Sequence, residues 1–112
     1  MLENCDWDVL TFKADEIKAF AHPLRLAILD ILAQGELCVC ELMEQLTLEQ
    51  AVISKHLRIL KDAGLVMCRK DGLKMYYTLT CPCVTDLLNQ ITATLKAIAN
   101  RRQIIFRRIQ KL

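Results

Sequence analysis

The hydrophobic pattern of the chain changes period twice, and this limits the folds open to it. Apolar residues recur at helical spacing over 14–62, alternate over 65–79, and return to helical spacing over 84–110. Asp71-Gly72 interrupts the alternating stretch, and this dipeptide favours a two-residue turn between antiparallel strands. The pattern predicts a single, mainly helical domain over 1–112 with one β-hairpin, in the order α-α-α-α-β-β-α.

The first helical stretch divides at turn signals. Residues 1–13 are expected to form an N-terminal arm ahead of four helices. Thr47 and Gln50 form a capping-box pattern that would begin the last of these helices. Two short helices over 38–62 followed by a basic hairpin over 65–79 predict a winged helix-turn-helix, with the hairpin as the wing. The four helices are expected at 14–21, 23–33, 38–46 and 48–62.

The last helix, 84–110, predicts a homodimer. Its apolar positions follow spacings of four and three, as in a coiled-coil seam that packs against its symmetry mate. Trp7, near the N-terminus, is expected in the same interface, so both ends of the chain would contribute to the dimer. The seam positions are 84, 88, 91, 95, 98, 105 and 109.

Charge is divided unevenly along the chain. Residues 1–56 carry four Lys and Arg against ten Asp and Glu, which gives −6, and residues 57–112 carry eleven against three, which gives +8; the net charge is +2. A basic half suits nucleic acid. No apolar run approaches the length of a membrane span, and the N-terminus does not resemble a signal peptide, so we expect a cytoplasmic protein without membrane contact.

The fourth helix has the composition of a DNA-reading element. If Ile53, Leu57 and Leu60 face the core, its other positions face outward. Gln and Arg side chains can contact base edges, whereas Ser, Lys and His suit phosphates or single edges. The predicted DNA-binding residues are Gln50, Val52, Ser54, Lys55, His56 and Arg58 on the helix, with Arg69, Lys70 and Lys74 near the hairpin tip.

Six cysteines are the candidate chemical groups. In a reducing cytosol they are expected to act as ligands or redox groups rather than as structural bridges. Cys38 and Cys40 fall in the expected first turn of the third helix, where side chains two residues apart point about 200° apart. One ion held by both thiolates would therefore have to distort or unwind that turn. Cys81 and Cys83 form a second pair, and Cys68 is expected to pack inside a strand.

Two runs of sequence resemble the ArsR/SmtB family of metal- and metalloid-responsive repressors. They are Leu37-Cys38-Val39-Cys40-Glu41-Leu42 and the run from Ile53 to Val66, and the similarity extends over 17–79. The resemblance implies a homodimeric winged-helix repressor on a palindromic double-stranded operator, released when a toxic ion binds. It also implies that Ser54 and His56 are recognition-helix positions.

The resemblance implies two classes of inducer ion. The Cys38/Cys40 pair is similar to the As(III)/Sb(III) site of the family and also to its Cd(II)/Pb(II) site, in which a cysteine near the partner's N-terminus joins the pair. Cys5 is the candidate for that role. Met43 stands where arsenite repressors often carry a third cysteine, and its place on the core stripe predicts packing. The source of a third ligand, including Cys81 and Cys83, stays open at this point.

Other functions leave different signals in a sequence. Thiol oxidation at a Cys-x-Cys pair is an alternative trigger. A structural Zn(Cys)4 site is disfavoured, because paired zinc ligands normally have two to four residues between them. The last helix has no histidine for a zinc site, and His22 is explained as a helix cap. An enzyme is not expected, since the chain has no Cys-x-x-Cys motif, phosphate loop or acid–base pair.

Overall fold

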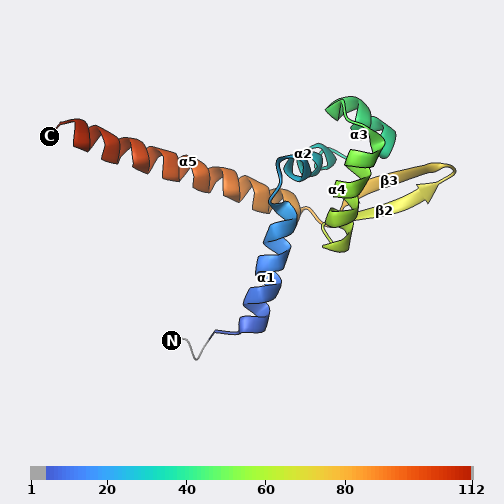
Figure 1. Cartoon of the computed structure of the whole chain (residues 1–112), viewed down its shortest axis with the longest axis horizontal. Coiled ribbons are helices and arrows are strands. Elements are labelled where there is room, and N and C mark those ends of the chain that lie inside the picture. Colours follow the sequence, from blue (N-terminus) through green and yellow to red (C-terminus); the bar gives the residue numbers. More distant parts are fainter. Residues whose placement is uncertain (1–4, 112) are drawn as a thin grey trace. The chain divides into compact units, whose positions relative to one another are not determined.

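The computed structural model describes residues 5–111 as two compact units, one ending at Cys81 and the other starting at Pro82 (Figure 1). The predicted class, a mainly helical fold with a β-hairpin wing, is confirmed. One strand, β1, was not predicted. The elements are α1 (Trp7–Phe20), α2 (Pro23–Leu32), β1 (Leu37–Cys38), α3 (Val39–Leu46), α4 (Gln50–Asp62), β2 (Val66–Asp71), β3 (Lys74–Leu79) and α5 (Cys83–Gln110).

Helix α1 begins earlier than predicted. The expected arm over 1–13 is helical from Trp7, and residues 1–4 lie outside the described part of the chain. The Asp6 carboxylate caps the helix by accepting hydrogen bonds from the backbone N–H groups of Asp8 and Val9, at 3.1 and 3.2 Å. This cap satisfies donors that the first turn would otherwise leave unpaired. Asp6 is a residue type that commonly caps helices, but it lies outside the apolar repeat from which the start of the helix was predicted.

The core lies between α2, α3, α4 and the start of β2. As predicted, Ile53, Leu57 and Leu60 of α4 are fully buried. Helix α4 packs against α2, α3 and β2, and burial of each large apolar side chain stabilises the fold by about 1.5–3 kcal/mol. The buried apolar side chains of those elements include Ile28, Leu29 and Leu32 of α2, Leu42 of α3 and Val66 of β2.

The turn between α3 and α4 differs from the prediction. Thr47 adopts the left-handed conformation with φ 54° and ends α3, while the backbone N–H of Leu48 donates to the Met43 carbonyl at 3.3 Å. Glu49, without a side-chain cap, precedes the first residue of α4, Gln50. The capping box predicted from Thr47 and Gln50 is therefore wrong, because Thr47 terminates one helix instead of starting the next.

The wing is the larger part of a three-stranded antiparallel sheet in the order β1-β3-β2. Asp71 pairs with Lys74, so the hairpin loop is Gly72-Leu73 and not the predicted Asp71-Gly72. Gly72 has φ +63°, which suits the first loop position of the tight hairpin turns. On the other side of β3, Cys38 of β1 pairs with Tyr76. The cysteine run is thereby joined to the wing.

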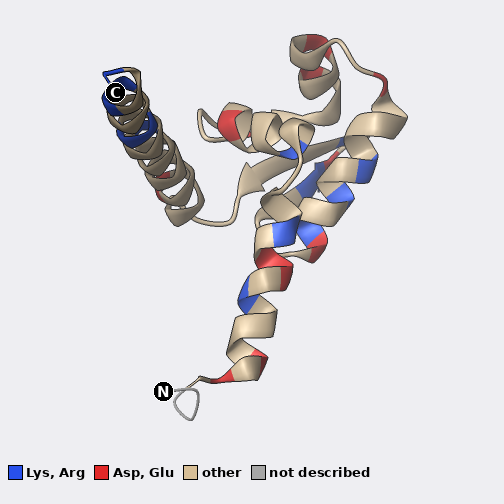
Figure 2. Cartoon of the chain, turned by 60° about the vertical axis from the view of Figure 1, so that its left-hand side comes forward, with Lys and Arg blue, Asp and Glu red and all other residues tan. Residues whose placement is uncertain are grey.

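Helix α5 forms the second unit, with 28 residues and a basic C-terminal part (Figure 2). Arg107 and Arg108 in its last turn complement the partial negative charge of a helix C-terminus. Within the described residues, no helix is both long and apolar enough to cross a membrane. Exposed apolar side chains recur along α5 at Leu87, Ile91, Leu95, Ile98, Ile105 and Ile109.

Candidate thiol site and nucleic-acid interface

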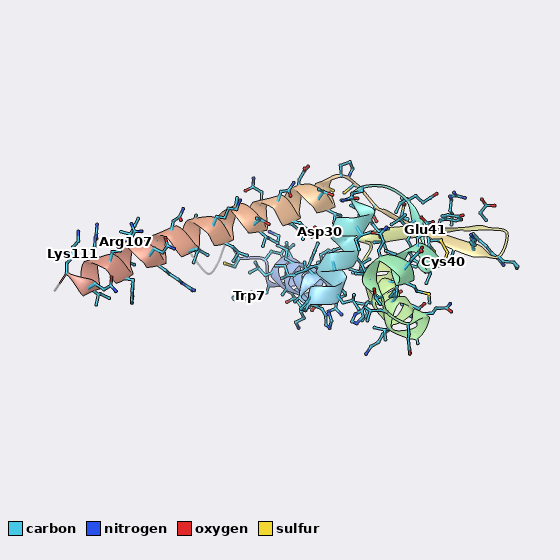
Figure 3. The ribbon with its side chains drawn as sticks, turned by 90° about the horizontal axis from the view of Figure 1, so that it is seen from above. Trp7, Asp30, Cys40, Glu41, Arg107 and Lys111 are labelled. Atoms are coloured by element: carbon cyan, nitrogen blue, oxygen red, sulfur yellow. A yellow bond between two sulfur atoms is a disulfide. The ribbon has the colours of Figure 1, made fainter. Side chains whose placement is uncertain are left out.

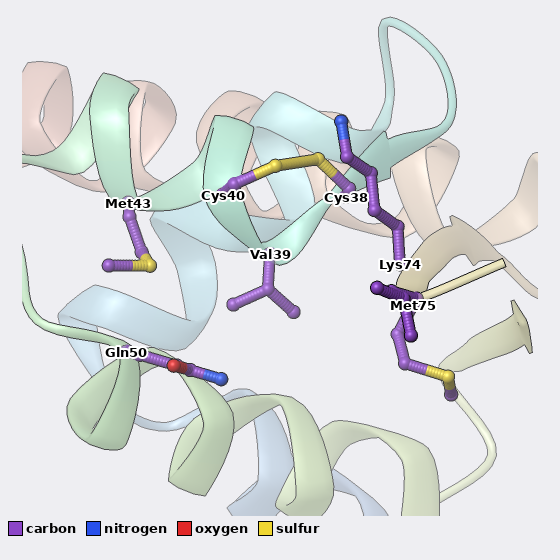
Figure 4. A pocket seen from close by; sticks show the side chains of 8 residues that line it. Cys38, Val39, Cys40, Met43, Gln50, Lys74 and Met75 are labelled. Atoms are coloured by element: carbon purple, nitrogen blue, oxygen red, sulfur yellow. A yellow bond between two sulfur atoms is a disulfide. The ribbon is translucent and has the colours of Figure 1, made fainter. Parts of the chain in front are cut away.

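Cys38 and Cys40 lie at the junction of β1 and α3, where their sulfur atoms are joined in a disulfide (Figure 4). Cys38 precedes the helix and has an extended backbone, with φ −84° and ψ 166°, and Cys40 is the second helical residue. The argument that the two side chains diverge by 200° assumed that both are helical, and it is therefore wrong here. The sulfurs meet while α3 stays intact from Val39 onward.

The two sulfurs differ in their surroundings. Cys38 is 1% exposed, whereas Cys40 is exposed at the surface. Glu41 lies in the first turn of α3, and its Oε1 atom accepts a hydrogen bond from the Cys38 backbone N–H at 3.4 Å. The same oxygen lies 3.1 Å from the Cys38 Sγ atom. The site thus combines one buried sulfur beside a carboxylate with one sulfur open to solvent.

The thiol pair opens into a pocket of about 220 Å³ between α3, the start of α4 and the wing tip. Gln50 comes from α4 and Lys74 from β3, and both are predicted DNA-binding residues (Figure 4). The two cysteines therefore line the same cavity as residues of the elements that are expected to read DNA. Its other lining residues are Val39, Met43, Leu73 and Met75.

The remaining cysteines are placed as follows. Cys5 is exposed ahead of α1, and Cys68 is half-buried in β2 opposite Tyr77, as expected for a strand residue. Cys81 and Cys83 fall on either side of the boundary between the two compact units. Among residues 5–111, no group of three or more His, Cys, Asp or Glu side chains is assembled to hold a metal ion. Ligand roles for Cys5, Cys81 and Cys83 remain predictions.

Most of the predicted α4 positions do face outward. Gln50, Val52, Lys55 and Arg58 are exposed and Ser54 is half-buried. Arg58 also lies 4.0 Å from the Asp62 carboxylate, an exposed pair of the kind that contributes little to stability. The outer face of α4 thus offers one amide and two cationic groups to a ligand.

His56 is the exception, and its predicted outward orientation is wrong. It is only 8% exposed, because it follows Ile53 by three residues and so lies on the same helix face as Leu57 and Leu60. Its ring lies 4.4 Å from that of His22, and the Arg25 Nη1 atom is 3.2 Å from its Nδ1 atom. Arginine can only donate, so Nδ1 accepts this hydrogen bond and the ring is neutral.

This cluster connects three helices. Arg25 of α2 also donates to the carbonyls of Ala19 and Lys18 at the end of α1, at 2.7 and 3.2 Å. The His22 Nδ1 atom caps α2 by accepting from the Leu24 N–H at 3.0 Å, which confirms its expected capping role. His56 is therefore a structural residue that fixes α4 against α1 and α2.

The buried position of His56 predicts a pH-dependent stability. Burial lowers the pKa of His56, and the neighbouring His22, Arg25 and Lys55 charges lower it further. In the window below the usual value of 6.5 the unfolded chain binds the proton more readily than the folded chain, so stability is lost as the pH falls through this window. We expect urea unfolding between about pH 8 and pH 5 to show this loss, and the His56→Gln variant to show a flatter profile. Equal slopes for the two proteins would contradict the assignment.

The wing cations have different environments. Lys70 and Lys74 are exposed, as predicted. Arg69 instead donates two hydrogen bonds to the Glu36 carboxylate, at 2.9 and 2.6 Å, and its guanidinium lies 4.8 Å from the centre of the Tyr76 ring. The hydrogen bond from Arg69 lowers the pKa of the Glu36 carboxyl. Arg69 thus ties the wing to the segment before Cys38, and a DNA contact would have to compete with this pair.

Comparison with known proteins gives the same family from sequence and from structure. Residues 22–67 match the bacterial regulatory proteins of the arsR family. An arsenical resistance operon repressor of Staphylococcus aureus is 39% identical over 75 residues, covering 67% of this chain and 72% of that protein. A solved structure from Mycobacterium tuberculosis superposes with a TM-score of 0.78 at 33% identity, covering 84% of this chain and 95% of the other.

A second solved structure, from Mycobacterium bovis, is described as a homodimeric winged helix-turn-helix DNA-binding domain. It is 31% identical with a TM-score of 0.75, and the match covers 83% of this chain and 86% of that one. The family match, the sequence identities and the two superpositions therefore agree. The chain described here therefore belongs to the ArsR family, whose members are DNA-binding transcriptional regulators and not enzymes.

Proposed function

We propose that this protein represses a metalloid-resistance operon and leaves its operator when As(III) or Sb(III) binds the thiolates of Cys38 and Cys40. The observation that carries the proposal is the adjacency of these two sulfurs in a pocket shared with Gln50 and Lys74. Soft thiolates select thiophilic ions of this kind. The name of the Staphylococcus aureus relative, an arsenical resistance operon repressor, supports the same class of ion.

The coupling between ion and DNA follows from the elements that carry the two sulfurs. Cys38 belongs to β1, which pairs with β3 of the wing, while Cys40 belongs to α3, which packs against α4. An ion bound to both sulfurs fixes the start of α3 relative to the wing. An inducer must favour the released conformation over the DNA-bound one. We propose that the operator requires a different spacing of α4 and wing from the one that the ion fixes.

The operator contact is proposed for the outer face of α4 and the tip of the wing. In helix-turn-helix proteins the second helix lies in the major groove, where amide and guanidinium groups read base edges and lysines meet phosphates. Arg69 and His56 are not included, because the first is paired with Glu36 and the second is buried. The proposed contacts are Gln50, Val52, Ser54, Lys55 and Arg58, with Lys70 and Lys74.

A homodimer is proposed from the apolar side chains left exposed on α1 and α5. On α1, Trp7, Phe12 and Ile17 are each more than 60% exposed. Exposed apolar surface of this extent marks an interaction surface. The Mycobacterium bovis neighbour is described as a homodimer. Two copies of α4 would then meet two half-sites of a palindromic operator, inside the cytoplasm where such DNA is found.

The class of inducer ion depends on which group supplies the third ligand. As(III) takes three ligands, of which Cys38 and Cys40 supply two. A hydroxide is the simplest third ligand. If the partner's Cys5 supplies the third ligand, the three thiolates would also suit Cd(II) or Pb(II), which is the alternative inducer class. Thiolate charge-transfer absorption of wild type and of Cys5→Ser, measured with As(III) and with Cd(II), tests this ligand, because only a site completed by Cys5 loses absorption in the variant.

The experiment that tests the proposed function is operator release by reduced, full-length protein. Wild type is expected to leave a labelled operator fragment on addition of As(III) or Sb(III). The double variant Cys38→Ser, Cys40→Ser is expected to bind the same DNA with unchanged affinity and to stay bound. The matched control is Cys68→Ser, which removes a thiol from β2 outside the pocket. Undiminished release of the double variant would overturn the proposal.

A second candidate trigger is favoured by one observation, the Cys38–Cys40 disulfide itself. In this case two thiols lose two electrons and two protons to an oxidant such as peroxide, and the bond that forms changes DNA affinity. Peroxide would then release the operator in the presence of a strong metal chelator, and a dithiol reductant would restore binding. Failure of peroxide to change DNA affinity excludes this trigger.

A further inference from the structure

We propose that the ion pair between Glu36 and Arg69 couples the Cys38/Cys40 pair to the wing, so that inducer binding at the sulfurs reaches the operator through it. The inference rests on the proposed function, because it names the residues that transmit the signal of that same site. It is carried by the two-pronged contact of Arg69 with Glu36, by the position of Glu36 two residues before Cys38, and by the register of the sheet. Neither residue is proposed to touch the ion or the DNA, so both are positioning residues.

The sheet places the cysteine strand and the two wing strands in one row. Cys38 of β1 lies opposite Tyr76 of β3, and Tyr76 lies opposite Arg69 of β2. Residues that lie directly opposite each other share a face of the sheet. The Arg69 guanidinium lies over the Tyr76 ring, 4.8 Å from its centre, and reaches Glu36 in the segment that leads into β1. One side chain therefore spans all three strands.

The backbone connection between β1 and the wing is short. Strand β1 has two residues, and its register with β3 comprises two residue pairs. Across the same sheet, the Arg69 Nε and Nη2 atoms donate to the two carboxylate oxygens of Glu36, at 2.9 and 2.6 Å. A two-pronged pair of this kind fixes orientation as well as distance. It therefore holds the segment before Cys38 directly to β2, a strand with which β1 forms no ladder.

Arg69 has a second carboxylate within reach, which gives the link two discrete arrangements. Its Nη1 atom is 3.6 Å from the Asp71 carboxylate, which lies on the same strand next to the wing tip. Paired with Glu36, Arg69 joins the wing to the Cys38 segment. Paired with Asp71 alone, it would leave the wing free of that segment. Coupling between two sites requires an element with two arrangements that both sites bias, and Arg69 provides one.

The Cys38 end of this link responds to chemistry at the sulfurs. Cys40 is on α3, which packs against β1 and β3, and Figure 3 shows it at the start of that helix beside the wing. In the reduced protein the two thiols are free to move apart, whereas an ion bound to both fixes their spacing. Because Glu36 and Cys38 are two residues apart, a shift of Cys38 changes the fit of Glu36 to the two donors of Arg69.

The pair is expected to matter more for coupling than for folding. The Arg69 and Glu36 side chains are 54% and 32% exposed, and ion pairs that are so open to solvent contribute little to stability. In Glu36→Gln the side chain keeps its length and can still accept one hydrogen bond, but the charged, two-pronged contact is lost. The variant should therefore match wild type in its circular dichroism spectrum and melting curve.

The test measures how strongly the inducer changes operator affinity in reduced, full-length protein. Fluorescence anisotropy gives the operator dissociation constant with and without saturating arsenite, and the ratio of the two constants is the coupling factor. Coupled sites typically change each other's affinity about 5- to 150-fold, and wild type should fall in this range. Glu36→Gln should fall to about twofold or less. The matched control is Asp15→Asn, which removes a carboxylate from the exposed Lys18 pair of α1 and should keep the wild-type factor.

A reciprocal measurement separates coupling from a structural role. The operator must weaken arsenite binding by the same coupling factor, which thiolate–arsenic absorption measures in titrations with and without DNA, after subtraction of the Cys38→Ser, Cys40→Ser signal. Glu36→Gln should bind arsenite normally as free protein but lose this effect of DNA. Arg69→Gln should lose it too, and the double variant should lose no more than either single variant, because the two residues act as one unit. A structural role would lower the affinities and leave the coupling factor unchanged.

The inference and the proposed function fail on different outcomes. If arsenite releases wild type and Glu36→Gln equally, the inference is overturned and the proposed function stands. If arsenite leaves wild type bound, the proposed function is refuted, and the coupling factor is then measured between peroxide-oxidised and dithiol-reduced protein. Equal factors for wild type and Glu36→Gln in that comparison, or no change of affinity in wild type, overturn the inference as well.

Discussion

Replacing Leu57 by alanine is expected to lower the free energy of unfolding by about 2–5 kcal/mol. The side chain is fully buried in α4, which packs against α2, α3 and β2, and the cavity left by truncation cannot be filled without moving one of these elements. Domains of this size have a total stability of about 5–15 kcal/mol. Urea denaturation followed by circular dichroism measures the loss directly.

The matched control for this variant is Leu73→Ala. Leu73 is the same residue type, and it is 100% exposed at the wing tip. Its truncation should therefore leave the free energy of unfolding within about 0.5 kcal/mol of the wild-type value. If the two variants lose equal stability, Leu57 does not occupy the core described here. The comparison thus tests the packing of the recognition helix without requiring DNA.

The parts of the fold that follow from hydrophobic spacing could be predicted from the sequence. Ile53, Leu57 and Leu60 were expected in the core and are fully buried. The same spacing placed His56 on that face, three residues after Ile53, but its polar ring suggested DNA contact. Burial of a histidine is tolerated only where partners are present, and here they are Arg25 and His22 from elsewhere in the chain. A single helix pattern does not reveal such partners.

The candidate site shows a similar division. The Cys-x-Cys run was recognised from residue types, whereas its geometry was not, because Cys38 belongs to a two-residue strand whose partner, Tyr76, lies 38 positions further along the chain. Strand pairing over this distance is decided by the tertiary fold and not by local propensity. The pocket that joins Cys40 to Gln50 and Lys74 arises from the same long-range contact.

The Glu36–Arg69 pair shows why charge alone is a weak guide to a DNA contact. Arg69 was expected to contact the DNA backbone or the minor groove because it is basic and close to the hairpin tip. Its donors are instead directed to a carboxylate 33 positions earlier in the chain. The surface lysines have no such competitor among the ion pairs described between residues 5 and 111, apart from the Lys18–Asp15 pair of α1. Lys55 is therefore a sharper test of the DNA interface than Arg69.

Replacing Lys55 by glutamine is expected to weaken operator binding about 10- to 50-fold at physiological salt, and to do so for specific and nonspecific DNA alike. Lys55 is exposed in the second turn of α4, between Ser54 and the buried His56. A lysine at this position neutralises a phosphate and releases condensed counterions, and these contributions to the binding free energy do not depend on base sequence. A homodimer loses two such contacts, one from each copy.

The salt dependence separates a phosphate contact from a general effect of charge. The slope of log K against log salt concentration should become shallower by nearly 2, because each lost phosphate contact removes about 0.9. Lys61→Gln removes the same charge from the last turn of α4, outside the proposed interface, and should leave that slope nearly unchanged. Fluorescence anisotropy over a range of salt concentrations measures both quantities. If the two variants change the slope equally, Lys55 contributes only to the overall electrostatic field of the protein. The proposed contact of α4 with the DNA backbone would then be wrong.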